Sequence, residues 1–160
     1  LLTIGIARGG EAPNREIVKM QAIFIVNFTK YIQWPDEAGE KTTIGIYGES
    51  DVSAELQKLL SLKSSLNLHV KRISTAAEVA SCDVVFIPSS AYDALSQVEA
   101  ASQQHSVLIV TETEMPVEAN QGGIGFYMEN QKMKFIINRA HVENRNLKVS
   151  NNLLGLAKVI

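Results

Sequence analysis

The most suggestive polar residues of the 160-residue sequence are Asn138, Arg139 and His141, which follow an apolar run at 133–137. An arginine can bind a carboxylate or phosphate through two parallel hydrogen bonds, and a histidine can change its charge near neutral pH. Trp34, at the end of a long apolar segment, could add an aromatic wall. We therefore expect a small-ligand pocket formed by Asn138, Arg139, His141 and Trp34. The alternative is that Arg139 and His141 are surface caps and Trp34 belongs to the core.

Residues that could support catalysis or bind a metal form no recognisable motif. His69, His105 and His141 lie far apart, and with the single Cys82 they give no pair at metal-ligand spacing. The serines lack a G-x-S-x-G elbow, and Cys82 has no activating neighbour. We expect no catalytic residue, no metal and no cofactor. A binding protein is favoured over an enzyme, and an unrecognised hydrolase is the weaker alternative.

Two glycine-containing turns also differ from a nucleotide-binding loop. The turn at 48–51 matches neither G-x-G-x-x-G nor a P-loop, and its acidic side chains would repel a phosphate. We expect a tight turn in which a Ser or Asp side chain caps the next helix. Gly122 and Gly123 lead into a strand, where glycine permits a bulge or a close backbone approach.

The composition indicates one globular domain. The chain has 15 Lys and Arg against 17 Asp and Glu, a formal net charge of −2, and 46% hydrophobic residues. This balance disfavours nucleic acid as a partner, because binding phosphates requires a basic face. The apolar content excludes disorder, and no apolar run reaches the roughly 18–20 residues of a membrane span. The single cysteine rules out an internal disulfide.

The pattern of apolar runs predicts a single α/β domain. Short apolar strands are expected at 43–47, 66–73, 84–87 and 107–110, separated by helical patterns. Such an alternation favours right-handed crossovers and a parallel sheet that is covered on both faces. Two further strands, at 124–128 and 133–137, are so close in sequence that they must form an antiparallel hairpin. The predicted fold is a mixed, mostly parallel sheet of about four parallel strands plus a C-terminal antiparallel hairpin, flanked by helices.

Helices are predicted on both sides of these strands. The longest covers 16–34 and should be largely buried, against the sheet or a second subunit, because residues 22–26 are apolar all round. A second helix is expected at 51–62, and a short one after the capping-box spacing of Thr75 and Glu78. The remaining helical patterns begin at Ser90 and cover 139–145 and 151–159.

The first residues of the chain have two interpretations. Residues 1–7 are apolar and are followed by a flexible stretch at 8–10. They could be the remnant of a secretory signal peptide or a short strand at the edge of the sheet. We therefore divide the chain into an N-terminal segment, 1–14, and an α/β domain, 15–160. One unpaired cysteine fits either the cytosol or the periplasm.

Taken together, six stretches resemble the YfiR family (DUF4154). They are 20–35 (MQAIFIVNFTKYIQWP), 43–48 (TIGIYG), 82–87 (CDVVFI), 122–126 (GGIGF), 135–138 (FIIN) and 147–157 (LKVSNNLLGLA). No single motif is specific, but six in the same order and spacing make coincidence improbable. The resemblance spans roughly residues 16–158, so 15–160 is expected to be a YfiR-like α/β domain.

The resemblance implies a bacterial periplasmic protein that is made with a signal peptide and is not an enzyme. The family's namesake is a dimeric inhibitor that binds the periplasmic part of a membrane diguanylate cyclase, and so represses cyclic di-GMP signalling and biofilm formation. Other relatives are sensory domains beside histidine kinases. Namesake-type members carry additional cysteines that form disulfides. The single Cys82 departs from that pattern and argues against a disulfide-dependent switch here.

An inhibitor of a membrane receptor needs an apolar patch with a polar rim rather than an active site. We expect this patch on the first and last helices, where Phe24, Ile25, Phe28, Leu153 and Leu154 would contact a second copy in a homodimer or a partner. The domain would bind one conformation of the receptor's periplasmic region and hold its cytoplasmic output off. The alternative is a periplasmic small-molecule sensor coupled to a histidine kinase or another receptor.

Overall fold

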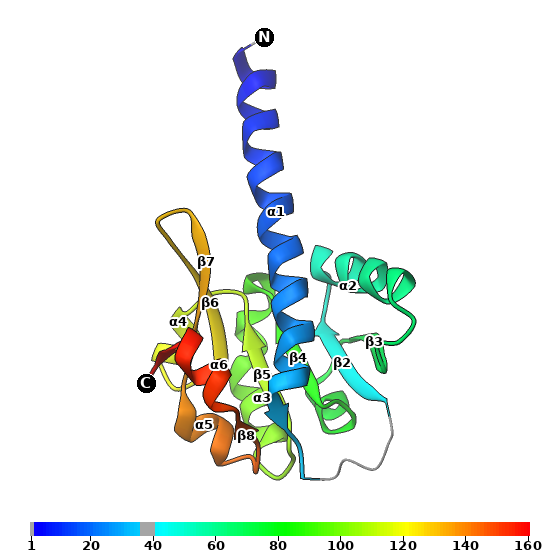
Figure 1. The fold of residues 1–160 in the computed structure, drawn as a ribbon, viewed down its shortest axis with the longest axis vertical. Helices are drawn as coiled ribbons and strands as arrows, with labels where there is room; N and C mark the ends of the chain where they lie inside the picture. Colours follow the sequence, from blue (N-terminus) through cyan, green and yellow to red (C-terminus); the bar gives the residue numbers. More distant parts are fainter. Residues whose placement is uncertain (1, 36–40) are drawn as a thin grey trace.

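A seven-stranded sheet forms the centre of the structure. The computed structural model describes residues 2–35 and 41–160, with the strands in the order β3-β2-β4-β5-β6-β7-β9 (Figure 1). Neighbouring strands from β3 to β6 are parallel, β7 is antiparallel to β6, and β9 joins β7 in parallel. The bounds are β2 Thr42–Tyr47, β3 Leu68–Ile73, β4 Val84–Ile87, β5 Leu108–Thr111, β6 Ile124–Glu129, β7 Lys132–Ile137 and β9 Lys158–Val159. The predicted mixed, mostly parallel sheet with its hairpin is confirmed, and β6 extends the parallel part.

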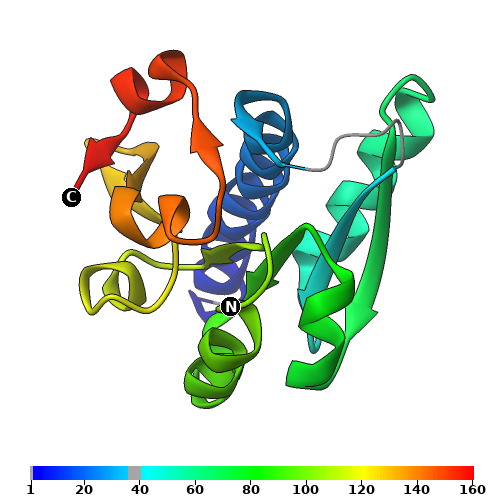
Figure 2. The ribbon, with the colours of Figure 1, turned by 90° about the horizontal axis from the view of Figure 1, so that it is seen from below.

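Helices cover both faces of this sheet, as predicted. Along β4, Val84 and Phe86 pack in a cluster with residues of α1 (Leu2–Tyr31) and α2 (Asp51–Leu62). Val85 and Ile87 point the other way, toward the 3₁₀ helix η1 (Ala76–Ser81) and α3 (Leu95–Ser102). Figure 2 shows α1 and α3 on opposite sides of the sheet. Successive strand residues face opposite sides, so the all-apolar sequence of β4 serves two cores at once.

The first helix differs from its prediction at both ends. It begins at Leu2, so residues 2–7 are helical and the predicted edge strand is wrong, while Leu1 lies outside the described residues. At the other end, the predicted helix stops early because β1 (Ile32–Gln33) pairs antiparallel with β8 (Lys148–Val149). The first part of α1 extends beyond the sheet, away from the rest of the chain (Figure 1). A strand partner distant in the sequence, rather than Pro35, therefore ends the helix.

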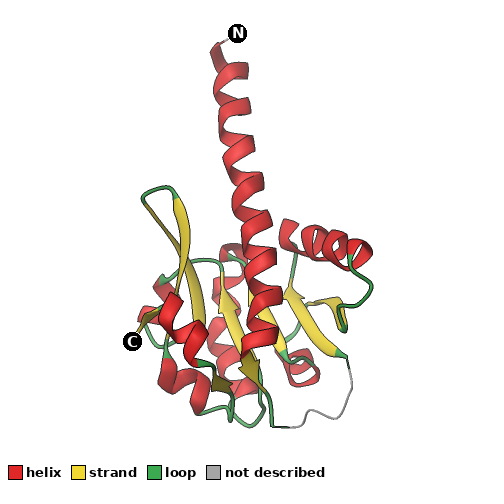
Figure 3. Cartoon of the chain, in the orientation of Figure 1, coloured by secondary structure: helices red, strands yellow, loops and turns green. Residues whose placement is uncertain are grey.

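The helix starts that the sequence marks with polar caps are confirmed. Ser50 caps α2, and its side-chain oxygen accepts a hydrogen bond from the backbone N–H of Val52 at 3.2 Å. Thr75 and Glu78 form the predicted capping box, although the helix that follows is 3₁₀ rather than α. The helix expected from Ser90 is divided into η2 (Ser89–Ala94) and α3. Figure 3 shows the helices packed around the strands of the sheet.

The last third of the chain contains the least predictable elements. The helices α5 (Arg139–Glu143) and α6 (Asn151–Leu156) are shorter than the predicted 139–145 and 151–159. The end of the second predicted helix is instead strand β9, paired with β7. The short helix α4 (Met115–Glu118) was not predicted. Two-residue strands carry no periodicity of their own, so tertiary pairing decides them.

Four phenylalanines fix α1 against the hairpin. Phe24 and Phe28 of α1 contact Phe126 of β6 and Phe135 of β7, with ring centroids 5.1–6.1 Å apart. Each fully buried aromatic side chain contributes about 1.5–3 kcal/mol to stability. This contact decides which side of α1 faces inward.

Candidate functional site

The structure does not bring Trp34 into one pocket with the polar residues after β7. The Trp34 indole N–H donates to the carbonyl oxygens of Ser106 at 3.0 Å and Asp83 at 3.3 Å, which precede β5 and β4. Trp34 lines a cavity of about 300 Å³ together with Cys82 and His105. Asn138, Arg139 and His141 are not among the lining residues of that cavity. The predicted four-residue pocket is therefore not assembled.

Asn138 and Arg139 act as surface residues of α5. The Asn138 side-chain oxygen accepts a hydrogen bond from the His141 N–H at 3.1 Å, so Asn138 is the N-cap of the helix. Its side-chain amide donates to Asn120 Oδ1 at 3.0 Å. The exposed Arg139 pairs with Glu143 at 2.7 Å, one turn further along. This agrees with the simpler alternative, in which these residues cap a surface helix.

His141 instead belongs to a buried polar cluster that the sequence analysis did not identify. We call Glu99, Ser102, His141 and Arg145 the Glu99 cluster. The Glu99 carboxylate accepts from His141 Nε2 at 2.7 and 2.8 Å and from Arg145 Nη2 at 2.5 Å. His141 and Arg145 are only 6% and 7% exposed, so the cluster is sheltered from solvent. It joins α3 to α5 and the turn after it.

The electrostatics of the Glu99 cluster are those of a closed ion-pair network. Burial lowers the pKa of the Arg145 guanidinium, and the Glu99 carboxylate opposes this shift. The Ser102 hydroxyl donates to the Glu99 carbonyl and accepts from Arg145. It is fully buried, so it is not placed as a nucleophile. Within the described residues, the other ring nitrogen of His141, Nδ1, has no hydrogen-bond partner.

Sequence spacing contained a signal for this cluster. Glu99 and Ser102 are three residues apart on α3, and His141 and Arg145 are four apart within the predicted helix 139–145, a spacing that would put each pair on one helical face. In the structure, Arg145 lies in the turn that follows α5. Two such pairs on helices that pack together can form a network. The sequence alone did not show that α3 and α5 are neighbours.

The predicted interface residues lie mainly in the core. Ile25, Phe28 and Leu153 are buried, and Phe24 and Leu154 are half-buried and pack against the same core. Ile25, Phe28 and Leu153 are therefore unavailable to a partner in the folded chain. The correction has a physical reason: residues 22–26 are apolar all round, and the hairpin phenylalanines select the inward side.

The exposed apolar side chains of α1 are different residues. Met20, Ile23 and Tyr31 are 37%, 38% and 43% exposed, and we call them the outer face of α1. At 100° per residue they lie within about 80° of one another around the helix, on the side opposite the buried Ala22 and Ile25. Lys19 and Lys30 are exposed beside them. An apolar strip with charged neighbours has the character of a protein-binding surface.

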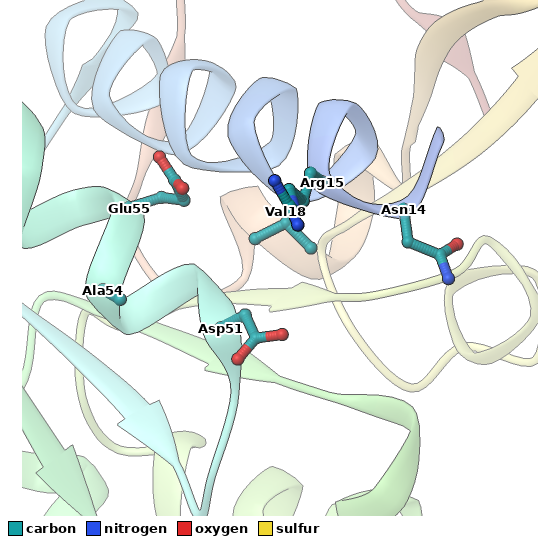
Figure 4. A pocket seen from close by; sticks show the side chains of 6 residues that line it. All are labelled: Asn14, Arg15, Val18, Asp51, Ala54 and Glu55. Atoms are coloured by element: carbon teal, nitrogen blue, oxygen red, sulfur yellow. The ribbon is translucent and has the colours of Figure 1, made fainter. Parts of the chain in front are cut away.

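A cavity of about 400 Å³ opens between α1 and α2, shown in Figure 4. Its lining includes Arg15 from α1 and the carboxylates Asp51 and Glu55 from α2. The chain places β3 on one side of β2 and then β4 on the other, so the strand order reverses here. Such a reversal at the carboxyl ends of parallel strands is where α/β sheets commonly bind ligands.

Two searches of the described residues gave negative results. No group of three or more His, Cys, Asp or Glu side chains in the described ranges could hold a metal ion. Among the helices described, including the long α1, none is apolar enough over the required length to cross a membrane.

Comparison with known proteins gives two positive results. The sequence model of the family DUF4154, described as YfiR/HmsC-like, matches residues 18–158. A search of curated proteins found no significant match. Among solved structures, the chain is similar to one described as an ABC domain from Streptococcus pneumoniae in complex with L-Trp, with a TM-score of 0.56.

The structural similarity concerns the fold. The two chains are 15% identical, and the match covers 89% of this chain and 60% of the other. The present chain thus spans less than two thirds of that structure.

Proposed function

Because the chain belongs to the YfiR/HmsC-like family, we propose that it is a non-catalytic periplasmic regulator of cyclic di-GMP signalling. Family membership supports a role in regulating diguanylate cyclases. In our proposal the protein binds the periplasmic domain of a membrane diguanylate cyclase. Binding favours the inactive conformation of the cyclase, so synthesis of cyclic di-GMP and biofilm formation are repressed.

The observation that carries this proposal is the outer face of α1. Met20, Ile23 and Tyr31 remain exposed although the core beneath α1 is already filled by Ile25 and Phe28. Several exposed apolar side chains on one face of a helix indicate a site of protein contact. They lie on one continuous helix, which suits docking against a helical periplasmic domain.

A homodimer forms part of the proposal. Of the five residues predicted for the interface, Phe24 and Leu154 retain partial exposure and can still contact a second copy. Export through a signal peptide, with residues 1–14 containing its remnant, would deliver the protein to the periplasm.

The test is calorimetric titration of the whole chain with the periplasmic domain of a membrane diguanylate cyclase from the same organism. We expect saturable binding at micromolar affinity or tighter. Ile23→Asp should weaken it about tenfold or more, equivalent to 1.4 kcal/mol, because a charge replaces a contact on the apolar face. The matched control is Leu62→Asp, at a residue 80% exposed at the end of α2, which should bind normally.

Two results would count against the proposal. Absence of binding, with both proteins folded by circular dichroism, would reject the cyclase as partner. Equal affinity of Ile23→Asp and the original chain would reject the outer face of α1 as the contact surface.

The second candidate function is small-molecule sensing, coupled to a histidine kinase or another receptor. It is favoured by the cavity between α1 and α2, where Arg15 could bind a carboxylate and Asp51 an amine. The similar solved structure holds L-Trp, a molecule with both groups. A ligand at about 100 times its dissociation constant would add about 2.7 kcal/mol of stability. A thermal-shift screen of amino acids, repeated with Asp51→Asn, tests this; no shift in the original chain would reject it.

No observation favours the hydrolase alternative, because the Ser102 hydroxyl is buried and bonded to Arg145.

A further inference from the structure

A third cavity, of about 420 Å³, lies where the end of α1 meets the two-stranded sheet β1–β8 and the start of α6. Residues 29–33 and 148–151 line it, and we call it the lysine cavity. In Figure 1, β8 and the end of α1 that lines this cavity lie opposite to the part of α1 that extends beyond the sheet. It is separate from the cavity between α1 and α2, with which it shares no lining residue.

The charged side chains that line the lysine cavity are positive. Among the described residues, its lining contains two charged side chains, Lys30 and Lys148, and no carboxylate. Both lysines are exposed, and neither forms an ion pair within the described part of the chain. The whole chain has a formal charge of −2, so the sign of this site is opposite to the net charge of the chain. Two lysines around one cavity attract an anion.

The rest of the lining can bind the remainder of an organic molecule. Tyr31 presents a half-exposed ring, which offers an apolar surface to a flat or ring-shaped group. Gln33 and Asn151 are exposed amides that can donate or accept hydrogen bonds. The combination of cations, amides and one aromatic ring differs from an ordinary solvated surface of mixed charge.

The backbone holds these groups in a fixed arrangement. Gln33 is directly opposite Lys148 in the β1–β8 pair. The Ser150 N–H donates to the Tyr31 carbonyl at 3.0 Å, which fixes the other side of the cavity. Preformed sites bind more tightly because less ordering is needed on binding.

We propose that the lysine cavity binds a small organic anion, with a phosphate or carboxylate between Lys30 and Lys148 and a ring packed against Tyr31. The inference rests on this cavity and does not require the proposed function, although Tyr31 belongs both to the cavity and to the outer face of α1. If both hold, the ligand would occupy the same helix that carries the outer face of α1.

The experiment is calorimetric titration of the whole chain with glucose 6-phosphate, glucuronate and uncharged glucose. At least one of the two anions should bind saturably, and glucose should not. Lys30→Gln or Lys148→Gln should each raise the dissociation constant about tenfold, because each removes a charge-assisted hydrogen bond. The double variant should abolish measurable binding. Lys63→Gln, at an exposed lysine outside the cavity, is the matched control and should bind like the original chain.

Circular dichroism shows whether the variants remain folded. We expect that they do, because both lysines are exposed. The proposal is overturned if neither anion binds at millimolar concentration or if glucose binds as well as the anions. It is also overturned if the Lys63→Gln control weakens binding as much as the cavity variants, because the anion would then sense overall charge. Whichever anion binds identifies the phosphate or the carboxylate as the preferred group.

Discussion

The Glu99 cluster and the lysine cavity place charged groups in opposite ways. In the cluster, the Glu99 carboxylate bonds both His141 and Arg145, and all three side chains are sheltered from solvent. In the cavity, Lys30 and Lys148 are exposed, and no carboxylate is among the lining residues that the structure describes. The first region neutralises its own charge, and the second leaves its charge accessible.

Solvation explains the difference. Burying a charge without a partner costs several kcal/mol of folding stability. A buried arginine is therefore tolerated only when a carboxylate lies close to it. An exposed lysine keeps its hydration and needs no partner. A closed cluster therefore supports the fold, whereas unpaired, accessible charges around a cavity can bind a ligand. Residue type alone made His141 a candidate for a ligand pocket. It does not distinguish a closed, buried cluster from an accessible site.

The largest expected loss of stability comes from a substitution that breaks the Glu99 cluster. Glu99→Ala would leave Arg145 buried without its carboxylate, and should lower the free energy of unfolding by about 3–5 kcal/mol. Urea denaturation followed by circular dichroism measures this. The control is Glu143→Ala, which removes a carboxylate from an exposed pair on α5. A loss below about 1 kcal/mol for Glu99→Ala would show that the cluster does not hold α3 to α5.

A smaller loss of stability is expected from a substitution that crowds the Glu99 cluster without changing its charge. A Cβ at Gly123 would lie 2.9 Å from Val142 Cγ2 and 3.4 Å from His141 Nδ1. Gly123→Ala should therefore cost about 1–3 kcal/mol of unfolding free energy, measured by the same denaturation. In Gly155→Ala the new methyl group meets nothing within 4 Å, so this helical control should be neutral or slightly stabilising. Equal stability of the two variants would contradict the close packing around His141.

An exposed ion pair on α5 should matter much less than the buried one. Arg139 and Glu143 are four residues apart and both solvent-exposed. Arg139→Ala should cost about 0.3–0.5 kcal/mol, and the difference should shrink in high salt because mobile ions screen exposed charges. Thermal unfolding at low and high salt measures both. A salt-independent loss would mean that Arg139 acts through packing instead.

The smallest effect on stability is expected from a substitution in the lysine cavity. Lys148→Gln removes an unpaired, exposed charge, so the free energy of unfolding should stay within about 0.5 kcal/mol of the original. Denaturation measures this on the same sample used for the anion titration. Destabilisation above about 1 kcal/mol would show that Lys148 has a structural role, and the contrast between the two regions would fail.

Local patterns predicted most elements that lie within one stretch of sequence. The helix after Ser50, the capping box of Thr75 and Glu78, and the apolar strand at Val84–Ile87 are all present. Their signals depend on neighbouring residues, through periodicity and capping. The hairpin was predictable for the same reason, since its two strands are adjacent in the chain.

The candidate sites were less predictable because they depend on which elements become neighbours. Trp34 and Arg139 carried suitable chemistry, but Trp34 bonds carbonyls that precede β4 and β5, and Arg139 remains on the surface of α5. The lysine cavity brings together residues more than 100 positions apart, which share no local pattern.

The amino-acid sequence by itself determined the family, the α/β class, the parallel strands with their hairpin and the caps of the main helices. These follow from short-range periodicity and from motif order along the chain. Tertiary structure alone decided which side of α1 is buried, because the middle of that helix is apolar in every direction. It also decided that His141 would lie within the buried Glu99 cluster while Lys30 and Lys148 would stay exposed, because burial and partners depend on contacts between elements far apart in the sequence.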